Sequence, residues 1–503
     1  MSALAGQPSE MAASMRFAER IGENLREACH GFAARPAMRM GAEEWSYQEL
    51  GAGVERFRDW LLAETTEGPI LLVPRNEPSS VAMVFGAIDS GRAPLLADPA
   101  WTPVELAEVV RRSAARALVL RKGSAVPAGF VLRAENGGYQ LLTAEAGAEP
   151  SAVALREDTA FGRFTSGTTG FPRCLQFSDA AALAAARGWA EAARLSPGDR
   201  VLCLATLNNG LCFNTSLLPV FLSGGLLAFH AGRVLPSSLE KSLIAVDATV
   251  FVAFPFAYDL LVKRPAGVPV GPALRLAVSS AAPLAGSTRE GWRQATGRSI
   301  CDYYGVAEVG PCTFNDGSVP DSVGRPLAGV SFTITDEAGL ELPAGETGLI
   351  RIRTRSMASD YLDREGPPFA ANLDEEGRYV SRDIGMLDAT GHLVLKGRRG
   401  RMINVAGRKI DPVEVEAVVR QVPGVNDVFV CGDESPGRTI LAAYVESESV
   451  TREQLVAFCV ARLAAYKVPQ DFVIVPRLPR SSTGKFSAPG IRALQQEGTT
   501  CLP

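Results

Sequence analysis

The sequence predicts a mixed α/β protein with more than one domain, and three observations carry this prediction. The chain has 503 residues, whereas single hydrophobic cores stop growing near ~250–300 residues. Up to about residue 115, short apolar segments alternate with helical patterns, which favours a doubly wound parallel sheet. After residue 322, short apolar runs are separated by turn signals, which predicts a small distorted β-barrel.

The first strands and helices can be placed from their end signals. An amphipathic pattern over residues 13–35 predicts a helix. Ser46 with Glu49 has the spacing of a capping box, which begins a second helix. The alternation places strands at residues 38–40, 44–46, 70–73 and 93–96, and further helices at residues 79–90 and 103–115.

The alternation of helices and strands continues beyond residue 179. We expect helices at residues 179–193 and 285–296, and strands at residues 200–205, 250–254 and 274–279. The most apolar segment, residues 201–232, is interrupted by Asn208, Asn209, Asn214 and several glycines. A membrane-spanning helix needs about 20 predominantly apolar residues. We therefore expect this segment to be buried core or the wall of a pocket.

The last hundred or so residues have the pattern of a small α+β domain. Asp411 and Pro412 suit the N-cap and first position of a helix. Thr451 and Gln454 cap a second helix that is expected to run to residue 463. Strands are expected at residues 427–430, 439–445 and 472–475.

Composition excludes several classes of function. A net charge of −4 and a pI near 5.7 argue against nucleic-acid or membrane partners held by a basic face. The nine cysteines form no Cys-x-x-Cys pair and only three histidines accompany them, so we expect no zinc site and reduced thiols. Because the N-terminus lacks a basic segment followed by an apolar run, we expect no signal peptide and a cytoplasmic location.

Residues 165–173 form the segment most suggestive of chemistry. They combine two glycines, four hydroxyl side chains and one cation. Consecutive backbone N–H groups in such a loop make a concavity for polyphosphate. A flexible turn between two strands is the alternative for its Gly-Thr-Thr-Gly core alone. The candidate phosphate-binding residues are Thr165, Ser166, Gly167, Thr168, Thr169, Gly170 and Arg173.

The string Thr-Ser-Gly-Thr-Thr-Gly-Phe-Pro-Arg resembles the phosphate loop of the adenylate-forming superfamily, which includes acyl- and aryl-CoA ligases. The resemblance extends over nearly the whole chain. It implies ATP, Mg²⁺ and coenzyme A as cofactors, and activation of a carboxylate as an acyl-adenylate before transfer to a thiol. It also implies an N-terminal adenylation domain, residues 1–399, and a mobile C-terminal domain, residues 400–503, that carries the catalytic lysine.

Several matching motifs imply a nucleotide site. Residues 302–308, Asp-Tyr-Tyr-Gly-Val-Ala-Glu, resemble the family's Tyr-Gly-x-Thr-Glu. Tyr304 would stack on adenine, and Glu308 would hold Mg²⁺. Ala307 departs from the motif, where a threonine donor is usual. The other adenine-side candidates are Ser280, Ala281, Tyr303 and Gly305.

The second half of the chain completes the implied site. Asp383 would accept both ribose hydroxyls, and Arg398 would contact ribose or phosphate. Gly400 lies at the implied hinge, and Gly407 belongs to a loop expected to face coenzyme A. Lys485 would bridge the acyl carboxylate and the α-phosphate, where charge builds during adenylation.

The acyl pocket is expected around residues 208–216. No aspartate occurs where amino-acid-activating relatives pair the α-ammonium group, so an α-amino acid is not the expected substrate. Asn209 matches a position that bonds an ortho substituent in aryl-acid enzymes, although it could instead cap the turn before Gly210. The substrate-binding candidates are Asn209, Gly210, Phe213, Phe254, Gly305 and Gly310.

Three functions are therefore open. The first is a carboxylate–CoA ligase for a small aromatic acid of benzoate, salicylate or anthranilate type, with medium-chain acids as the alternative. The second is an adenylation enzyme that loads a carrier protein in trans. The third, suggested by Ala307 and by Ser381-Arg382 in place of Thr-Gly, is a nucleotide-binding protein without chemistry. The expected partner is a small carboxylic acid, and the chain could form a homodimer.

Overall fold

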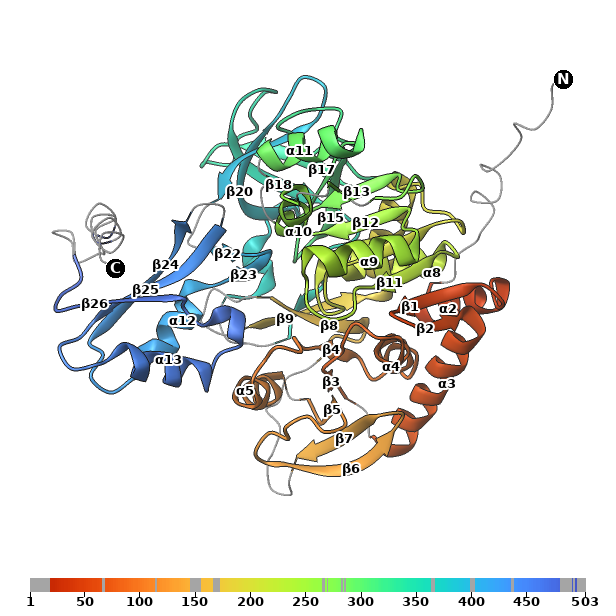
Figure 1. The fold of residues 1–503 in the computed structure, drawn as a ribbon, viewed down its shortest axis with the longest axis horizontal. Coiled ribbons are helices and arrows are strands. Elements are labelled where there is room, and N and C mark those ends of the chain that lie inside the picture. Colours follow the sequence, from red (N-terminus) through yellow and green to blue (C-terminus); the bar gives the residue numbers. More distant parts are fainter. Residues whose placement is uncertain are drawn as a thin grey trace.

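Two large sheets, a small antiparallel sheet and a C-terminal α+β unit make up the fold (Figure 1). The computed structural model describes residues 19–65, 68–113, 115–144, 155–165, 172–264, 267–268, 270–281, 284, 286–362, 367–398, 403–435, 438–479, 491 and 494.

Six neighbouring strands of the first sheet run parallel, and antiparallel strands border them. Its nine strands are, in spatial order, β16 (Arg325–Pro326), β15 (Gly310–Asn315), β14 (Cys301–Val306), β13 (Leu276–Ser279), β12 (Val250–Ala253), β10 (Arg200–Cys203), β11 (Leu226–Phe229), β1 (Pro36–Met40) and β2 (Glu43–Ser46).

The second sheet has eight strands and a parallel centre made of β8, β4, β3 and β5. Its order is β19 (Asp360–Tyr361), β9 (Arg173–Ser178), β8 (Thr159–Thr165), β4 (Pro94–Leu96), β3 (Ile70–Leu72), β5 (Ala117–Arg121), β7 (Tyr139–Ala144) and β6 (Phe130–Asn136). The antiparallel pair β8–β9 flanks residues 166–172, so the predicted phosphate loop connects two strands of this sheet.

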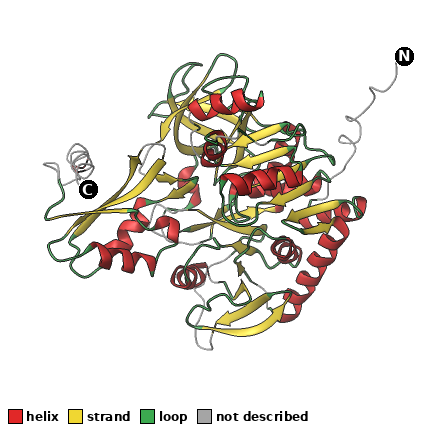
Figure 2. Cartoon of the chain, in the orientation of Figure 1, coloured by secondary structure: helices red, strands yellow, loops and turns green. Residues whose placement is uncertain are grey.

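Helices cover both faces of the nine-stranded sheet, as the predicted doubly wound architecture requires (Figure 2). One group contributes to a core shared by the two sheets: α2 (Ile21–Gly31), α3 (Tyr47–Glu64), α4 (Pro78–Asp89), α6 (Asp179–Ala192) and α8 (Leu218–Leu222). The opposite face is covered by α9 (Pro236–Val246), α10 (Pro255–Val262) and α11 (Gly286–Thr296). Helix α5 (Pro103–Ser113) packs on the second sheet.

Local signals explain where several helices begin and end. Helix α3 begins with the predicted capping box, in which Glu49 N–H donates to Ser46 Oγ and Ser46 N–H to Glu49 Oε2. Helix α2 ends at Gly31, earlier than predicted, and β1 begins at Pro36.

The apolar segment of residues 201–232 is buried, as predicted, but part of it is helical. After β10 the chain forms α7 (Gly210–Cys212), a π-helical turn (Phe213–Leu217) and α8. Within the part of the chain that the structure describes, no helix is both long and apolar enough to cross a membrane.

The region after residue 322 is built from short strands, as predicted. Four strands form an antiparallel sheet in the order β17 (Ser331–Thr335), β18 (Gly348–Arg353), β20 (Tyr379–Leu387) and β21 (Leu393–Arg398). A bridge between Leu393 of β21 and Gly324, directly before β16, connects this sheet to the edge of the nine-stranded sheet. A short 3₁₀ helix, Phe369–Asn372, precedes β20.

The C-terminal unit has its own hydrophobic core, and both of its predicted helices are present. The Thr451–Gln454 capping box begins α13, which ends at Val460 rather than at the predicted residue 463. The elements are β22 (Ile403–Val405), β23 (Arg408–Ile410), α12 (Pro412–Val419), β24 (Asp427–Ser435), β25 (Arg438–Glu446), α13 (Arg452–Val460), a 3₁₀ turn (Ala465–Lys467) and β26 (Asp471–Val475). Figure 1 shows this unit beside α5, where Lys467 of the 3₁₀ turn donates to Glu105.

Candidate active site

A cavity of about 570 Å³ lies between the large N-terminal part and the C-terminal unit. Leu204, Phe254 and Ser280, which follow the carboxyl ends of the parallel strands β10, β12 and β13, line one wall. Residues 405–409 of the C-terminal unit line another. In open α/β sheets, ligands bind outside the carboxyl ends of the strands. The cavity is therefore the candidate active site.

An aromatic wall separates part of this cavity from the protein interior. The rings of Phe254 and Phe256 are stacked, with centroids 6.3 Å apart and an interplanar angle of 16°. Gly407 approaches Phe254 so closely that a Cβ on Gly407 would lie 2.6 Å from the ring. The backbone of Gly407 is also left-handed, with φ of +85°, so glycine suits this close approach on two grounds.

The predicted adenine and ribose residues lie together. Strand β14 carries Tyr304 and strand β20 carries Asp383, and the Tyr304 hydroxyl donates to Asp383 Oδ2 at 2.8 Å. Burial, assisted by the charge of Asp383, raises the pKa of Tyr304 well above its usual value. The phenol therefore stays protonated and orients the carboxylate.

A chain of contacts connects Arg173 to Glu308 through Tyr361. The Arg173 guanidinium carbon lies 3.6 Å from the centre of the Tyr361 ring, and Nη1 donates to the Pro367 carbonyl at 2.7 Å. The Tyr361 hydroxyl in turn donates to Glu308 Oε1 at 3.5 Å. Pairing of β19 with β9 sets this geometry, so Arg173 positions the segment that contacts Glu308.

Most of the described candidate residues border the cavity. Those that line it are Thr165, Asn209, Gly210, Phe254, Ser280, Ala281, Tyr303, Gly305, Gly310 and Gly407. Phe213, predicted as part of the wall, is not a lining residue. It is only 1% exposed, and its ring stacks on Phe161 at 4.4 Å. The π-helical turn directs Phe213 into the core.

Other predicted site residues lie outside the described residues. They are Ser166, Gly167, Thr168, Thr169, Gly170, Gly400 and Lys485, together with the side chain of Arg398.

Asn209 performs the alternative role considered for it. Its Oδ1 accepts a hydrogen bond of 2.8 Å from the Leu211 N–H, which caps the short helix α7. Its amide nitrogen has no hydrogen-bond partner among the described residues, and the residue lines the cavity. The cap therefore leaves the amide donor available to a ligand.

Ala281 adopts a strained backbone conformation at the edge of the cavity. Its φ is +73°, a left-handed region that costs a residue other than glycine roughly 1–2 kcal/mol. Its carbonyl accepts a hydrogen bond from the Asn404 amide of the C-terminal unit. Strain of this kind is typical of ligand-binding segments.

The motif search did not identify Arg163, which lines the cavity from strand β8. Its side chain is almost fully buried, and burial lowers the pKa of the guanidinium to about 10. The guanidinium carbon lies 4.5 Å from the ring centre of Phe177 and 5.6 Å from that of Phe213. The sequence feature that could have identified Arg163 is its position as a lone arginine in an apolar strand directly before the phosphate loop.

Sequence reasoning also missed the ion pairs that join the C-terminal unit to the large N-terminal part. Lys467 is 3% exposed, and its ammonium donates to Glu414 at 2.6 Å and to Glu105 of α5 at 3.0 Å. Burial alone would lower the pKa of Lys467, but the neighbouring negative charges raise it above its usual value. Arg408 forms a second pair across the boundary, 2.8 Å from Asp98.

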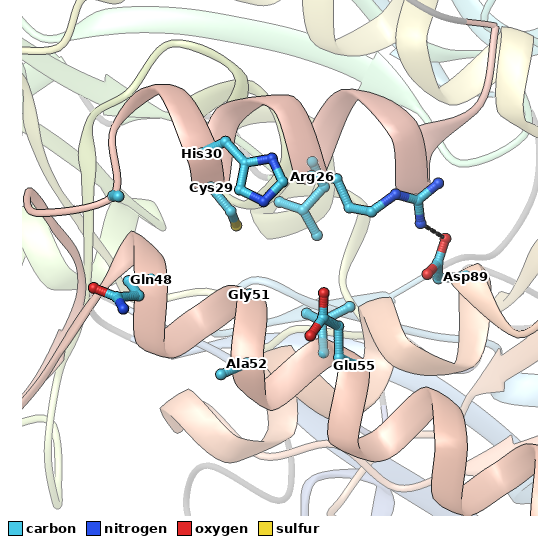
Figure 3. Close-up of a pocket in the computed structure, with 11 residues that line it drawn as sticks. Arg26, Cys29, His30, Gln48, Gly51, Ala52, Glu55 and Asp89 are labelled. Atoms are coloured by element: carbon cyan, nitrogen blue, oxygen red, sulfur yellow. Dashed lines mark hydrogen bonds and ion pairs between the residues drawn. The ribbon is translucent and has the colours of Figure 1, made fainter.

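A second cavity, of about 420 Å³, lies between α2 and α3 (Figure 3). Cys29 and Glu55 face it from the two helices, and Arg26 pairs with Asp89 at one end. Burial, with a smaller contribution from Glu55, raises the pKa of the Cys29 thiol to about 12, so this thiol is not a nucleophile near neutral pH.

Comparisons with known proteins agree with this geometry. The family model described as AMP-binding enzyme matches residues 25–362, and that of the AMP-binding enzyme C-terminal domain matches residues 414–485. A 3-hydroxybenzoate–CoA ligase of Aromatoleum sp. (strain CIB) is 27% identical, over 93% of this chain and 95% of the relative. A medium-chain fatty-acid–CoA ligase of Escherichia coli (strain K12) is 30% identical, over 64% of this chain and 59% of the relative.

Solved structures share the fold. The o-succinylbenzoate CoA synthetase of Bacillus subtilis, bound to a product analogue, matches with a TM-score of 0.81 at 21% identity. The match covers 93% of this chain and 98% of that structure.

Both family models, together with a cavity between the large N-terminal part and the C-terminal unit, identify an adenylate-forming enzyme. The chain belongs to the AMP-binding enzyme family. It is an AMP-forming acid–thiol ligase, the class of its curated CoA-ligase relatives.

Proposed function

We propose that this ligase activates a small aromatic acid of benzoate, salicylate or anthranilate type and transfers the acyl group to coenzyme A. The observation that carries the proposal is the composition of one cavity. Phe254 and Phe256 offer flat apolar surface for a ring, Ser280 and Ala281 border the predicted adenine side, and Gly407 comes from the predicted thiol-facing loop. Acid, nucleotide and thiol would meet there.

In the first half-reaction, a carboxylate oxygen of the acid attacks the α-phosphorus of ATP and pyrophosphate leaves. Residues 165–170 with Arg173 would hold the phosphates, and Asp383 would accept the ribose hydroxyls, with Tyr304 at the adenine. Catalysis of this kind depends mainly on positioning and charge neutralisation.

Glu308 is the residue that would hold Mg²⁺. It is half-buried, and among the described residues its carboxylate accepts one long hydrogen bond, of 3.5 Å from Tyr361, which leaves lone pairs for a cation. Mg²⁺ in nucleotide sites is commonly bound by one or two carboxylates together with phosphate oxygens. A bound Mg²⁺ would neutralise charge on the phosphates.

For the second half-reaction, we propose that residues 400–503 rotate as a domain about Gly400 relative to residues 1–399. Rotation would remove Lys485 from the nucleotide and bring the Gly407 loop to the cavity. Residues 405–409 line the cavity in the structure, which supports assigning this arrangement to the thioester step. The thiolate sulfur would attack the acyl carbonyl, and AMP would leave.

Two experiments separate this proposal from its alternatives. Pyrophosphate release with a panel of aromatic and medium-chain acids would identify the acid, and absence of release with every acid would favour the nucleotide-binding protein without chemistry. Mass spectrometry with coenzyme A and a candidate carrier protein offered separately would identify the acceptor. Acyl transfer to the carrier alone would contradict coenzyme A as the acceptor.

Replacing Asp383 is expected to weaken ATP binding selectively. Asp383→Ala removes a carboxylate that would accept two charge-assisted hydrogen bonds, each worth about 1.5–3 kcal/mol. We expect KM for ATP to rise at least about tenfold, with KM for the acid changed much less, measured by pyrophosphate release.

Tyr304→Phe is the matched control for Asp383→Ala. It removes the hydroxyl that donates to Asp383 at 2.8 Å but keeps the carboxylate and the ring. The rise in KM for ATP should be smaller than with Asp383→Ala. Equal KM values for ATP in wild type and Asp383→Ala would remove Asp383 from the ribose site.

Replacing Asn209 is expected to change the preference among benzoates. Asn209→Ala removes the amide donor, so kcat/KM for salicylate, whose ortho oxygen can accept from that donor, should fall relative to that for benzoate. Asn209→Ser is the control, because it keeps an acceptor for the Leu211 N–H without the amide. The two variants should lose the ortho preference alike. An unchanged preference in Asn209→Ala would contradict the assignment.

A further inference from the structure

Arg163 carries a buried positive charge that the fold does not pair. Arg163 is 4% exposed, and its buried Nη1 has no hydrogen-bond partner among the described residues. The guanidinium forms no ion pair with any described residue. Because an unpaired charge is costly to bury, the position calls for a partner that the described residues do not supply.

The groups around the guanidinium are arranged as expected for an anion-binding site. The rings of Phe177 and Phe213 lie within cation–π distance, 4.5 and 5.6 Å from the guanidinium carbon, which partly offsets the burial of charge. Gly210 packs directly on the guanidinium, since a Cβ there would lie only 2.8 Å from Nη1. These contacts hold the cation in place without satisfying its donors.

The charged and polar groups that face Arg163 leave room for an anion. Glu308 acts on it through space without forming an ion pair, and the Tyr303 hydroxyl, hydrogen-bonded to Asn214, is a second neighbour. Asn208 also lines the cavity, and its Oδ1 is buried with no partner. The acyl end of the cavity therefore contains one strong unpaired donor group and one unpaired acceptor.

We propose that Arg163 binds a second carboxylate of the substrate, so that the benzoate-type acid of the proposed function carries a further carboxylate, with its ring against the Phe254–Phe256 wall. A guanidinium presents parallel N–H donors whose geometry matches a carboxylate. One carboxyl group would lie against Arg163 while the other reacts with ATP. The inference rests on the proposed function and specifies its substrate class.

The test compares acids that differ only by the second carboxylate. Benzoate is compared with phthalate, isophthalate and terephthalate, and butyrate with glutarate, by kcat/KM for pyrophosphate release. Wild-type enzyme should prefer at least one dicarboxylate over its monocarboxylate about tenfold or more. Arg163→Met, which keeps volume and removes charge, should abolish that preference, and Arg163→Lys should retain part of it.

A second variant tests the inference even if Arg163→Met fails to fold. Gly210→Ala places a methyl group against Nη1 and should reduce kcat/KM for the dicarboxylate more than for its monocarboxylate. A wild-type preference for monocarboxylates, or a dicarboxylate preference that survives both Arg163→Met and Gly210→Ala, would overturn the inference.

Binding measurements keep this inference distinct from the proposed function. Calorimetric titration of wild type and Arg163→Met with the same dicarboxylate, in the presence of AMP, reports the subsite without chemistry. Arg163-dependent binding without pyrophosphate release from any acid would support the subsite and contradict the ligase proposal. Adenylate formation with monocarboxylates and no Arg163-dependent binding would contradict the subsite alone.

Discussion

Lys485→Ala is expected to remove adenylate formation and leave the thioester step largely intact. The lysine would neutralise charge that develops between the acyl carboxylate and the α-phosphate, so its loss should raise the barrier of that step only. Removing one preorganised donor of this kind costs about 10²–10³-fold in kcat. Pyrophosphate release measures the first step, and acyl transfer to coenzyme A from chemically prepared acyl-adenylate measures the second.

Lys485→Arg provides the control for the lysine, because it keeps the positive charge and changes its geometry. The rate of adenylate formation should fall less in Lys485→Arg than in Lys485→Ala. Equal loss of both half-reactions in Lys485→Ala would contradict a scheme in which the C-terminal domain presents different faces to the two steps.

Lys467→Met is expected to have the opposite effect, impairing the thioester step and sparing adenylation. The Lys467 ammonium lies between Glu105 of the large N-terminal part and Glu414 of the C-terminal unit. Removing one member of a buried ion pair costs about 3–5 kcal/mol, so this docked arrangement should be less populated. The resulting loss in acyl transfer from acyl-adenylate should be about 10²–10³-fold.

Two further variants test whether the loss comes from the interdomain charge. Adding Glu105→Gln to Lys467→Met removes one of the two carboxylates that face each other and should recover part of the acyl transfer. Lys263→Met removes an exposed lysine that pairs with Asp259 within one helix and should change neither step. A larger loss of pyrophosphate release than of acyl transfer in Lys467→Met would show that the docked arrangement serves adenylation.

Local signals allowed much of the fold to be predicted. The capping boxes at Ser46 and Thr451 and the alternation of apolar strands with helices depend on neighbouring residues, and the structure contains them. The strand pairs β6–β7 and β8–β9 were not predicted. Pairing between strands is decided by tertiary contacts as well as by strand pattern, so the pattern alone does not specify it.

The candidate site was predictable in part for the same reason. Tyr304 and Asp383 belong to short strings that the sequence displays, and the structure brings them within a hydrogen bond of each other. Phe213 was assigned to the wall of the cavity, but the π-helical turn directs it into the core. A change of helical register alters which side chains face a cavity, and spacing alone does not reveal it.

The sequence by itself determined the family, the reaction class and the strings that would hold the nucleotide, because these depend on residues adjacent in the chain. Only the tertiary structure decided which charges are left unpaired and which are shared between the two parts of the molecule. Arg163 and Lys467 belong to none of the matching motifs, and their significance comes from burial. The free energy of a buried charge depends on its exposure to solvent and on its partners in the folded protein. The order of residues along the chain specifies neither of these.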